Sequence, residues 1–287
     1  MNYNLKVISA YKGMMEYISA ARSAESPDLV KLWAEYVLDP YWNEWAAGQF
    51  NEERTRREMS DPITDTDSLE EAVKALSASN IEEMLRKAYK KISQRLPPPE
   101  ADKVACVYAN TWIDAGVHGV VGMCIGDSIL IQVNPLILGW KAYVPWVLAH
   151  EYNHTIWGYN YYYLKRNSSH DLLTAIITEG EADSFAKVVC PEVHPRWLRA
   201  LTAEQEREQW VALKEYLFCE DNMELHRRFF FGDEKTSTPV NTGYTIGFSI
   251  VQAYLKARPG VSFTELAGID AKEILEVGGY DKTLSLK

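Results

Sequence analysis

The 287-residue chain has no uninterrupted apolar run that approaches the roughly 20 residues of a membrane-spanning helix. Its N-terminal segment also lacks the apolar core of a signal peptide. The four cysteines are scattered, form no CxxC pair and lie mostly among apolar residues. This pattern favours buried thiols over a disulfide set or a cysteine-based metal cluster. Together these absences predict a cytoplasmic protein without membrane insertion.

Basic residues are fewer than acidic ones. The chain has 30 Lys and Arg and 40 Asp and Glu, which gives a formal net charge of −10. A chain this acidic is a poor candidate for binding nucleic acid or an anionic membrane by charge, and its charge weakly disfavours acidic substrates. Internal repeats and low-complexity tracts are absent as well. What remains is 47% hydrophobic and 24% charged, the composition of a globular protein with a sizeable core.

Helical patterns separated by short breaks fill residues 3–96. The triplet Ser26–Asp28 predicts an N-cap with proline at the first helical position. The segment Asn80–Glu83 has the pattern of a capping box and predicts a long helix after it. Three consecutive prolines at 97–99 then end the helical pattern, because proline lacks the N–H donor that a helix interior needs.

A domain boundary is expected at these prolines, with a helical N-terminal region over residues 1–99 and a second domain over 100–287. Three β-rich runs come first in the second domain, at 103–110, 118–126 and 128–134. The pair Gly126-Asp127 between the last two indicates a hairpin. Helical patterns return at 140–157, 171–189, 203–217 and 244–257. Capping patterns at Thr202–Gln205, Ser262–Glu265 and Asp270–Glu273 predict the start of the helix at 203 and of two short helices after residue 260. This order predicts an α+β fold.

The most informative stretch is VLAHEYNHTI at 147–156, which contains the motif HExxH. Residues four apart on an α-helix face the same side, about 5.4 Å apart along the axis, so His150 and His154 can bind one zinc ion. Glu151 points past the metal, where it can take a proton from metal-bound water and pass it to a leaving amine. With six His in the chain, chance gives at most about 0.02 such motifs.

A catalytic zinc needs a third protein ligand and one open position. The segment ITEGEADSFA supplies a carboxylate at Glu179, and 24 residues separate it from His154. A glutamate ligand at this distance is typical of the glutamate-type zincins, or gluzincins. Asp183 lies one turn later on the same helix face. We expect it to accept an N–H from His150 and so to fix the tautomer of that ring.

Three motifs together resemble a known family: AHEYNH at 149–154, TEGEA at 178–182 and NTGYTIG at 241–247. A bacterial family of predicted zinc-dependent proteases, a domain of largely unknown function, similarly pairs HExxH with a downstream EGxA and a late GYxIG. The resemblance covers most of the chain from about residue 30 onward. It implies a zincin-like core in which the glutamate of EG, here Glu179, is the metal ligand, as in the aminopeptidase-type gluzincins.

The two residues after Glu179 lead to separate expectations. Gly180 indicates close packing against another helix, because glycine lets two backbones approach. Glu181 departs from the pattern of the family, which usually has an apolar residue after EG. We expect Glu181 on a solvated acidic face of the helix, where it places a charge near the site.

The run before the HExxH helix is a candidate for substrate binding. Peptidases of the zincin type bind substrate as an extra strand along a sheet edge. We therefore predict that Gly119, Val120, Val121 and Gly122 contact the peptide, since glycine in a strand allows close backbone approach by a ligand. An ordinary inner strand or a bulge is the alternative interpretation of this run.

Peptide hydrolysis builds negative charge on the former carbonyl oxygen, and a Tyr, His or Arg donor can stabilise it beside the metal. The resemblance and its place at a helix start favour Tyr244 as this donor, with His170 and His226 as alternatives. Because the chain has 17 Tyr, packing is the competing interpretation of Tyr244. His118 and His194 are expected to be surface or structural residues.

The combined patterns predict a mostly helical α+β protein with a zincin-like core and a small antiparallel or mixed sheet beside the HExxH helix. The predicted reaction is hydrolysis of a bond in a peptide or protein substrate, with one zinc ion as the cofactor and Glu151 as general base. The alternative is a catalytically silent zinc protein that acts as a regulatory or interaction module. A di-iron carboxylate bundle would need a second ExxH besides Glu151–His154, and no plausible helix of the sequence carries one.

Overall fold

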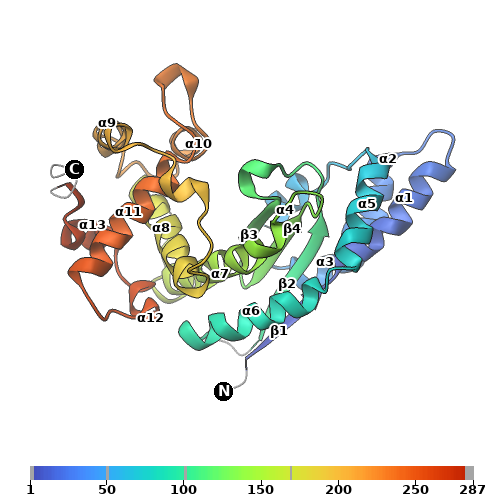
Figure 1. Ribbon diagram of the computed structural model, residues 1–287, viewed down its shortest axis with the longest axis horizontal. Coiled ribbons are helices and arrows are strands. Elements are labelled where there is room, and N and C mark those ends of the chain that lie inside the picture. The colour runs from blue at the N-terminus through green and yellow to red at the C-terminus, as the bar shows by residue number, and fades with distance from the viewer. Residues whose placement is uncertain (1–2, 50–51, 100–101, 169, 282–287) are drawn as a thin grey trace. The chain divides into compact units, whose positions relative to one another are not determined.

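The computed structural model describes residues 3–49, 52–99, 102–168 and 170–281 (Figure 1). The chain divides into two compact units, residues 1–155 and 156–287. The predicted α+β class is confirmed, since most described residues are helical and four strands form one mixed sheet. The domain boundary expected after residue 99 stays a prediction and borders residues 100 and 101, which lie outside the described residues. Among the described residues, no helix combines the length and the apolar character that a membrane span requires.

The first unit contains the sheet, with strands in the order β1-β2-β4-β3. The strands are β1 (Asn4–Ile8), β2 (Asp102–Ala109), β3 (Val120–Ile125) and β4 (Ser128–Val133). Strand β2 pairs in parallel with both β1 and β4, whereas β3 and β4 are antiparallel. The predicted hairpin is confirmed: β3 and β4 meet at Gly126, whose φ of 54° is one that glycine adopts without steric cost.

The prediction that residues 3–96 are helical is wrong for Asn4–Ile8, which form strand β1. Asn4 to Ile8 pair with Asp102 to Cys106 of β2, so the backbone groups of this segment are satisfied in the sheet rather than in a helix. Leu5 and Ile8 are buried, at 7% and 6% exposure. The pairing joins segments almost 100 positions apart, and a local pattern carries no signal of such a partner.

Six helices of the first unit precede β2 in the chain: α1 (Met14–Ser23), α2 (Leu29–Trp33), α3 (Asp39–Trp45), α4 (Glu52–Glu58), α5 (Thr66–Ser77) and α6 (Ile81–Arg95). Two predicted caps are corrected. The cap of α2 is Asp28, which accepts from the backbone N–H of Lys31, so Pro27 lies before the helix rather than at its first position. Asn80 precedes α6 with a φ of 56° and no side-chain cap bond. Glu83, at the third helical position, lies 2.6 Å from Nζ of Lys87 instead.

Helix α7 (Trp140–Gly158) carries the HExxH motif and confirms the helix predicted over 140–157. It is buried along most of its length, and Val144, Trp146 and Leu148 are each fully enclosed. The hydroxyl of Tyr152 donates to the carbonyl oxygen of Leu96 at 2.7 Å, just after the end of α6. A helix this apolar is held by packing on several sides, and its motif residues are therefore fixed in position.

The second unit is helical. It contains α8 (Leu172–Val189), α9 (Ala203–Lys214), α10 (Met223–Phe231), α11 (Thr242–Ala257), α12 (Phe263–Leu266) and α13 (Ala271–Gly278). The predicted capping boxes at Thr202 and Ser262 are confirmed, whereas α10 was not predicted. In Figure 1, α8 and α11 lie side by side, and these two helices make the most extensive helix pair of the unit.

Candidate metal centre

His150 and His154 face each other across one turn of α7. Their Nε2 atoms are 3.0 Å apart, and the ring planes meet at 82°. Both side chains are half-buried. Two nitrogen ligands of a tetrahedral zinc, each bound at 2.0–2.1 Å, lie about 3.3 Å apart. The spacing of the two nitrogens therefore matches that of two ligands on one ion to within a few tenths of an ångström.

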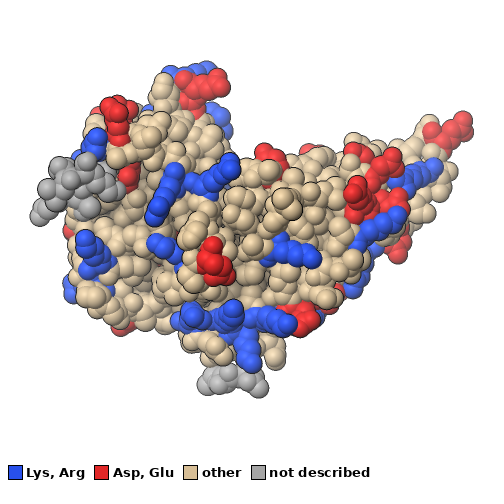
Figure 2. Space-filling view, viewed as in Figure 1, with Lys and Arg blue, Asp and Glu red and all other residues tan. Residues whose placement is uncertain are grey.

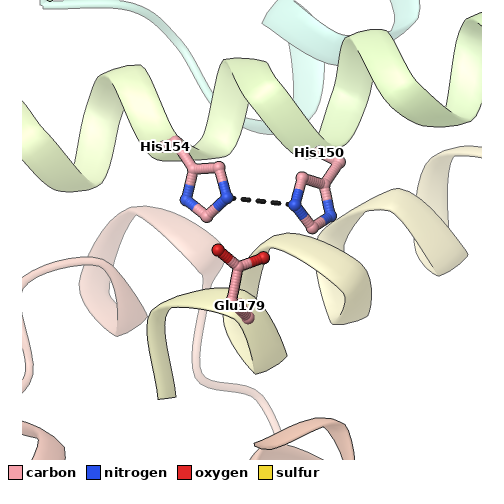
Figure 3. A group of neighbouring side chains, drawn as sticks. All are labelled: His150, His154 and Glu179. Atoms are coloured by element: carbon pink, nitrogen blue, oxygen red, sulfur yellow. Dashed lines mark hydrogen bonds between the residues drawn. The ribbon is translucent and has the colours of Figure 1, made fainter. Parts of the chain in front are cut away.

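Glu179 of α8 completes the group. The candidate ligand atoms of His150, His154 and Glu179 all lie within 4.8 Å of one another, and Figure 3 shows the carboxylate pointing toward the two rings. Two imidazoles and one carboxylate form a donor set that zinc accepts in catalytic sites, with a fourth position left for water or substrate. The chemistry of this group therefore fits the ion.

Glu151 is buried beside the edge strand of the sheet. Glu151 is 8% exposed. Gly122 of β3 has no side chain, and the side chain of Glu151 occupies the space that this leaves. A Cβ atom at position 122 would lie 2.4 Å from Cγ of Glu151 and 2.7 Å from Cγ1 of Val147. Sequence reasoning expected a ligand to approach this glycine. The structure shows that the side chain of the candidate general base approaches it.

Cys124 lies two residues after Gly122 on β3. Burial, and next the negative charge of Glu151, raise the pKa of the Cys124 thiol well above its usual range. The thiol is therefore protonated near neutral pH. Of the four cysteines expected to be buried, Cys106 and Cys190 are buried, whereas Cys124 and Cys219 are partly buried.

Two glycines fix the position of α8, and with it Glu179. A Cβ atom on Gly180 would lie 2.2 Å from the carbonyl oxygen of Gly247 on α11, and one on Gly247 would lie 2.1 Å from the carbonyl oxygen of Ile176. The two backbones are thus in direct contact. The close packing predicted at Gly180 is confirmed, and it joins the EG and GYxIG motifs physically.

Asp183 is fully buried one turn after Glu179. Both of its carboxylate oxygens accept from the indole N–H of Trp197, at 3.2 and 3.1 Å. Sequence reasoning missed Trp197, since tryptophan carries no metal or acid–base signal. The expected hydrogen bond between Asp183 and His150 stays a prediction.

A family model described as a predicted Zn-dependent protease (DUF2268) matches residues 81–276, well over half of the chain. The chain belongs to this family. The matched span begins at the first residue of α6 and ends inside α13, so it includes His150, Glu151, His154 and Glu179. Comparisons with curated proteins and with solved structures find no match.

Glu181 is the one expectation near the centre that the structure contradicts. This member of the predicted Zn-dependent protease family buries Glu181, at 1% exposure, and neither carboxylate oxygen has a hydrogen-bond partner among the described residues. Burial raises the pKa of this carboxyl well above its usual range, and the charge of Lys165 lowers it by less. The reason is that α8 is enclosed on nearly every side, with residues 180–186 all buried, so position 181 has no solvated face.

Tyr244, in the GYxIG motif of this family, is half-buried at the third position of α11. Its ring packs edge-on against Phe230 at 5.1 Å between centroids. The alternative donors lie in different settings. His226 stacks on the same Phe230 at 4.4 Å, and His170 Nδ1 lies 3.1 Å from the hydroxyl of Tyr162. The choice of Tyr244 over these two histidines stays a prediction.

Strand β3 ends the strand order of the described sheet. Of the predicted substrate contacts, Gly119 directly precedes the strand, and Val120, Val121 and Gly122 are its first three residues. The preceding His118 stacks on Tyr143 of α7 with 3.7 Å between ring centroids, which confirms a structural role for this histidine. His194 is exposed, as expected.

Proposed function

We propose that the protein is a zinc-dependent peptidase that hydrolyses peptide bonds in a peptide or protein substrate. The proposal rests on His150, His154 and Glu179, whose candidate ligand atoms lie within 4.8 Å of one another. Glu151, the residue after His150 on α7, is buried. In this proposal the three side chains hold one zinc ion. When bound, zinc supplies a Lewis acid that acidifies water and polarises the substrate carbonyl.

Glu151 is the general base and then the general acid. Its carboxylate accepts the proton of the attacking water and delivers it to the nitrogen of the leaving amine. The burial of Glu151 favours this transfer, because charges act at a lower dielectric constant there. The hydroxyl of Tyr244 donates to the developing oxyanion in the proposal, and Asp183 holds the ring of His150.

The substrate is proposed to lie along β3. An end strand presents backbone N–H and C=O groups on one side, and an extended peptide can pair with them as a further strand. Gly122 supports this placement, because the close approach of β3 and α7 sets Glu151 directly beside the strand. A peptide paired with residues 119–122 is thereby brought to the general base.

The decisive experiment measures metal content and peptide-library cleavage for the wild type and for Glu151→Gln. We expect one zinc per chain in both proteins and loss of at least about 100-fold in cleavage rate for the variant, since general base catalysis contributes about 10²–10⁴-fold. Zinc binding without cleavage of any peptide by the wild type would favour the silent regulatory or interaction module. Two irons per chain would contradict the zinc assignment.

A cytoplasmic location is part of the proposal. What supports it is the cysteine chemistry: the four cysteines form no disulfide among the described residues, and a reducing compartment keeps thiols in that state.

A further inference from the structure

Beyond the metal group, the second unit contains a cavity of about 570 Å³ that basic side chains surround. Its four basic lining residues are Lys187 of α8 and, in the segment after α8, His194, Arg196 and Arg199. Apolar residues of the same segment, among them Val193 and Leu198, line it as well. Phe248 of α11 forms an apolar wall, and Nζ of Lys187 lies 5.0 Å from the centroid of its ring. A cavity with three permanent positive charges and one apolar wall has the chemistry of a carboxylate-binding pocket.

The segment that carries the arginines is held rigidly. Trp197 donates to Asp183 of α8 at 3.1 and 3.2 Å. Its carbonyl oxygen accepts from the hydroxyl of Thr245 of α11 at 2.7 Å, and the backbone N–H of Ala200 donates to the same hydroxyl at 3.1 Å. The short turn from Arg196 to Arg199 is therefore fixed to both helices at its two ends, so the positive charges are positioned before a ligand arrives.

The cavity lies in line with the proposed zinc ligand. Glu179, Asp183 and Lys187 are spaced four residues apart on α8 and share one face of the helix. The eight residues from Glu179 to Lys187 correspond to about 12 Å along the axis, and an extended peptide covers that length with about three or four residues. Asp183 between them is fully buried and bonded to Trp197, so a peptide that reaches from the metal group to the cavity would pass over Trp197. Such a peptide would bring its side chains or its end to the cavity.

The basic side chains are available to a ligand. Within the described residues, neither Arg196, Arg199 nor Lys187 forms an ion pair with an acidic side chain. In Figure 2, blue side chains gather over the region of α8 and the segment that follows it, although the whole chain has a net charge of −10. The basic side chains of the cavity would attract a carboxylate despite the acidic balance of the chain.

We propose that this cavity binds a carboxylate of the peptide substrate, three or four residues from the bond that is cleaved. The inference rests on the proposed peptidase function, since it uses the metal group as the point of cleavage. The carboxylate comes from an Asp or Glu side chain or from the C-terminus of the peptide. The substrate class is thus an acidic peptide, or a peptide whose free C-terminus lies a few residues beyond the cleaved bond.

Binding to zinc-loaded Glu151→Gln tests the proposal without the need for hydrolysis. The probes are dye-labelled decapeptides with blocked ends and three consecutive Glu or three Gln, and a third with Gln and a free C-terminal carboxylate. Fluorescence anisotropy should show about tenfold tighter binding of the Glu peptide than of the blocked Gln peptide, as expected for a few partly exposed charge pairs. Tight binding of the third peptide identifies the C-terminal carboxylate as the source.

The double variant Arg196→Gln/Arg199→Gln, made in the Glu151→Gln protein, should reduce this preference to about twofold or less. Lys187→Gln gives an independent second test of the same cavity. Arg207→Gln is the matched control, because this exposed arginine on α9 does not line the cavity, and it should leave the preference unchanged. Equal affinities for all three peptides, or a preference that survives in both cavity variants, would overturn the proposal.

The same peptides separate the two proposals from each other. A preference for carboxylates in binding, combined with no cleavage of any peptide by the wild type, overturns the peptidase and leaves an anion-binding cavity. Cleavage of the Glu and Gln peptides with equal kcat/KM, combined with equal binding, overturns the cavity proposal and leaves the peptidase.

Discussion

Gly122 has no side chain, and this leaves room for the side chain of Glu151 beside the sheet. The nearest atoms that a Cβ would meet are Cγ of Glu151 and Cγ1 of Val147, and neither is the free end of a flexible side chain. A strand glycine usually costs stability because it has nothing to pack and loses more backbone freedom on folding. At position 122 the same glycine makes room for Glu151, the proposed general base.

Replacement of Gly122 by alanine is therefore expected to displace Glu151 while the zinc ligands stay in place. We expect unchanged zinc content and a fall in kcat/KM of about 100-fold, the effect of moving a catalytic group by about 1 Å. Metal analysis and peptide cleavage of the purified variant measure both. Gly268→Ala is the control, since the nearest atom to its added Cβ is 3.4 Å away. Full activity in a folded Gly122→Ala protein would show that Glu151 is not held by this contact.

Single residues differ in how well the sequence predicts them. The HExxH spacing is local, so the shared face of His150 and His154 follows from helix geometry alone. The burial of Glu181 depends instead on what surrounds α8, and charge is a poor guide to burial inside a helix that is covered on all sides. The space left by Gly122 is likewise a contact between a strand and a helix, which the sequence of the strand does not reveal.

Between elements, the crossing of α8 and α11 explains two motifs by one contact. Gly180 follows the proposed zinc ligand, and Gly247 ends GYxIG. A side chain at either position would collide with the backbone of the other helix. Helices that touch through glycine come closer than the 8–10 Å that larger side chains impose. The two glycines thus set how close α8, which carries Glu179, lies to α11.

Gly247→Ala is expected to separate the two helices, because its Cβ would overlap the carbonyl oxygen of Ile176. We expect the free energy of unfolding to fall by about 1–3 kcal/mol or more, as for other overpacked contacts, and zinc affinity to weaken. Urea denaturation followed by circular dichroism measures the first effect, and zinc titration measures the second. Gly158→Ala, at a helical glycine with open space around it, should leave stability equal or raise it by about 0.5–1 kcal/mol. Equal stabilities of Gly247→Ala and the wild type would contradict the backbone contact.

The elements themselves were predictable where their signals are local. The Gly126-Asp127 turn indicated the hairpin, and Thr202 and Ser262 marked helix starts through capping boxes a few residues long. The capping box expected at Asn80 does not form. Asn80 has a left-handed backbone conformation and makes no side-chain cap bond, and Glu83 pairs with Lys87 one turn later. An N-cap residue usually has an extended backbone, and the residue pattern alone does not reveal that Asn80 departs from it.

On the scale of the whole molecule, the acidic net charge and the basic cavity affect a ligand at different distances from the protein surface. The net charge governs the field far from the surface, and salt screens it over about 10 Å at ordinary ionic strength. The cavity acts on a ligand already in contact. Under the cavity proposal, the protein would discriminate among peptides after they arrive rather than by attracting them from a distance.

Zinc is expected to stabilise the folded chain, because its proposed ligands converge in the folded state and are far apart in an unfolded one. Free zinc at about 100 times its Kd should raise the free energy of unfolding by about 2.7 kcal/mol, and a chelator should remove the gain. Denaturation with zinc, with EDTA and with magnesium measures this, and magnesium should have little effect because it prefers oxygen ligands. His154→Ala should abolish the zinc effect. An equal shift in that variant would place the ion elsewhere.

The parallel pairing of β1 with β2 has a practical consequence for anyone who trims the chain. The span that matches the family begins at residue 81, whereas β1 covers Asn4–Ile8. A fragment cut to the family limits would lose one outer strand and leave the hydrogen-bonding groups of β2 without their neighbour, an open template on which further copies can add. Such a fragment should aggregate even though it keeps every residue proposed for catalysis, and we therefore expect β1 to protect the molecule from self-association.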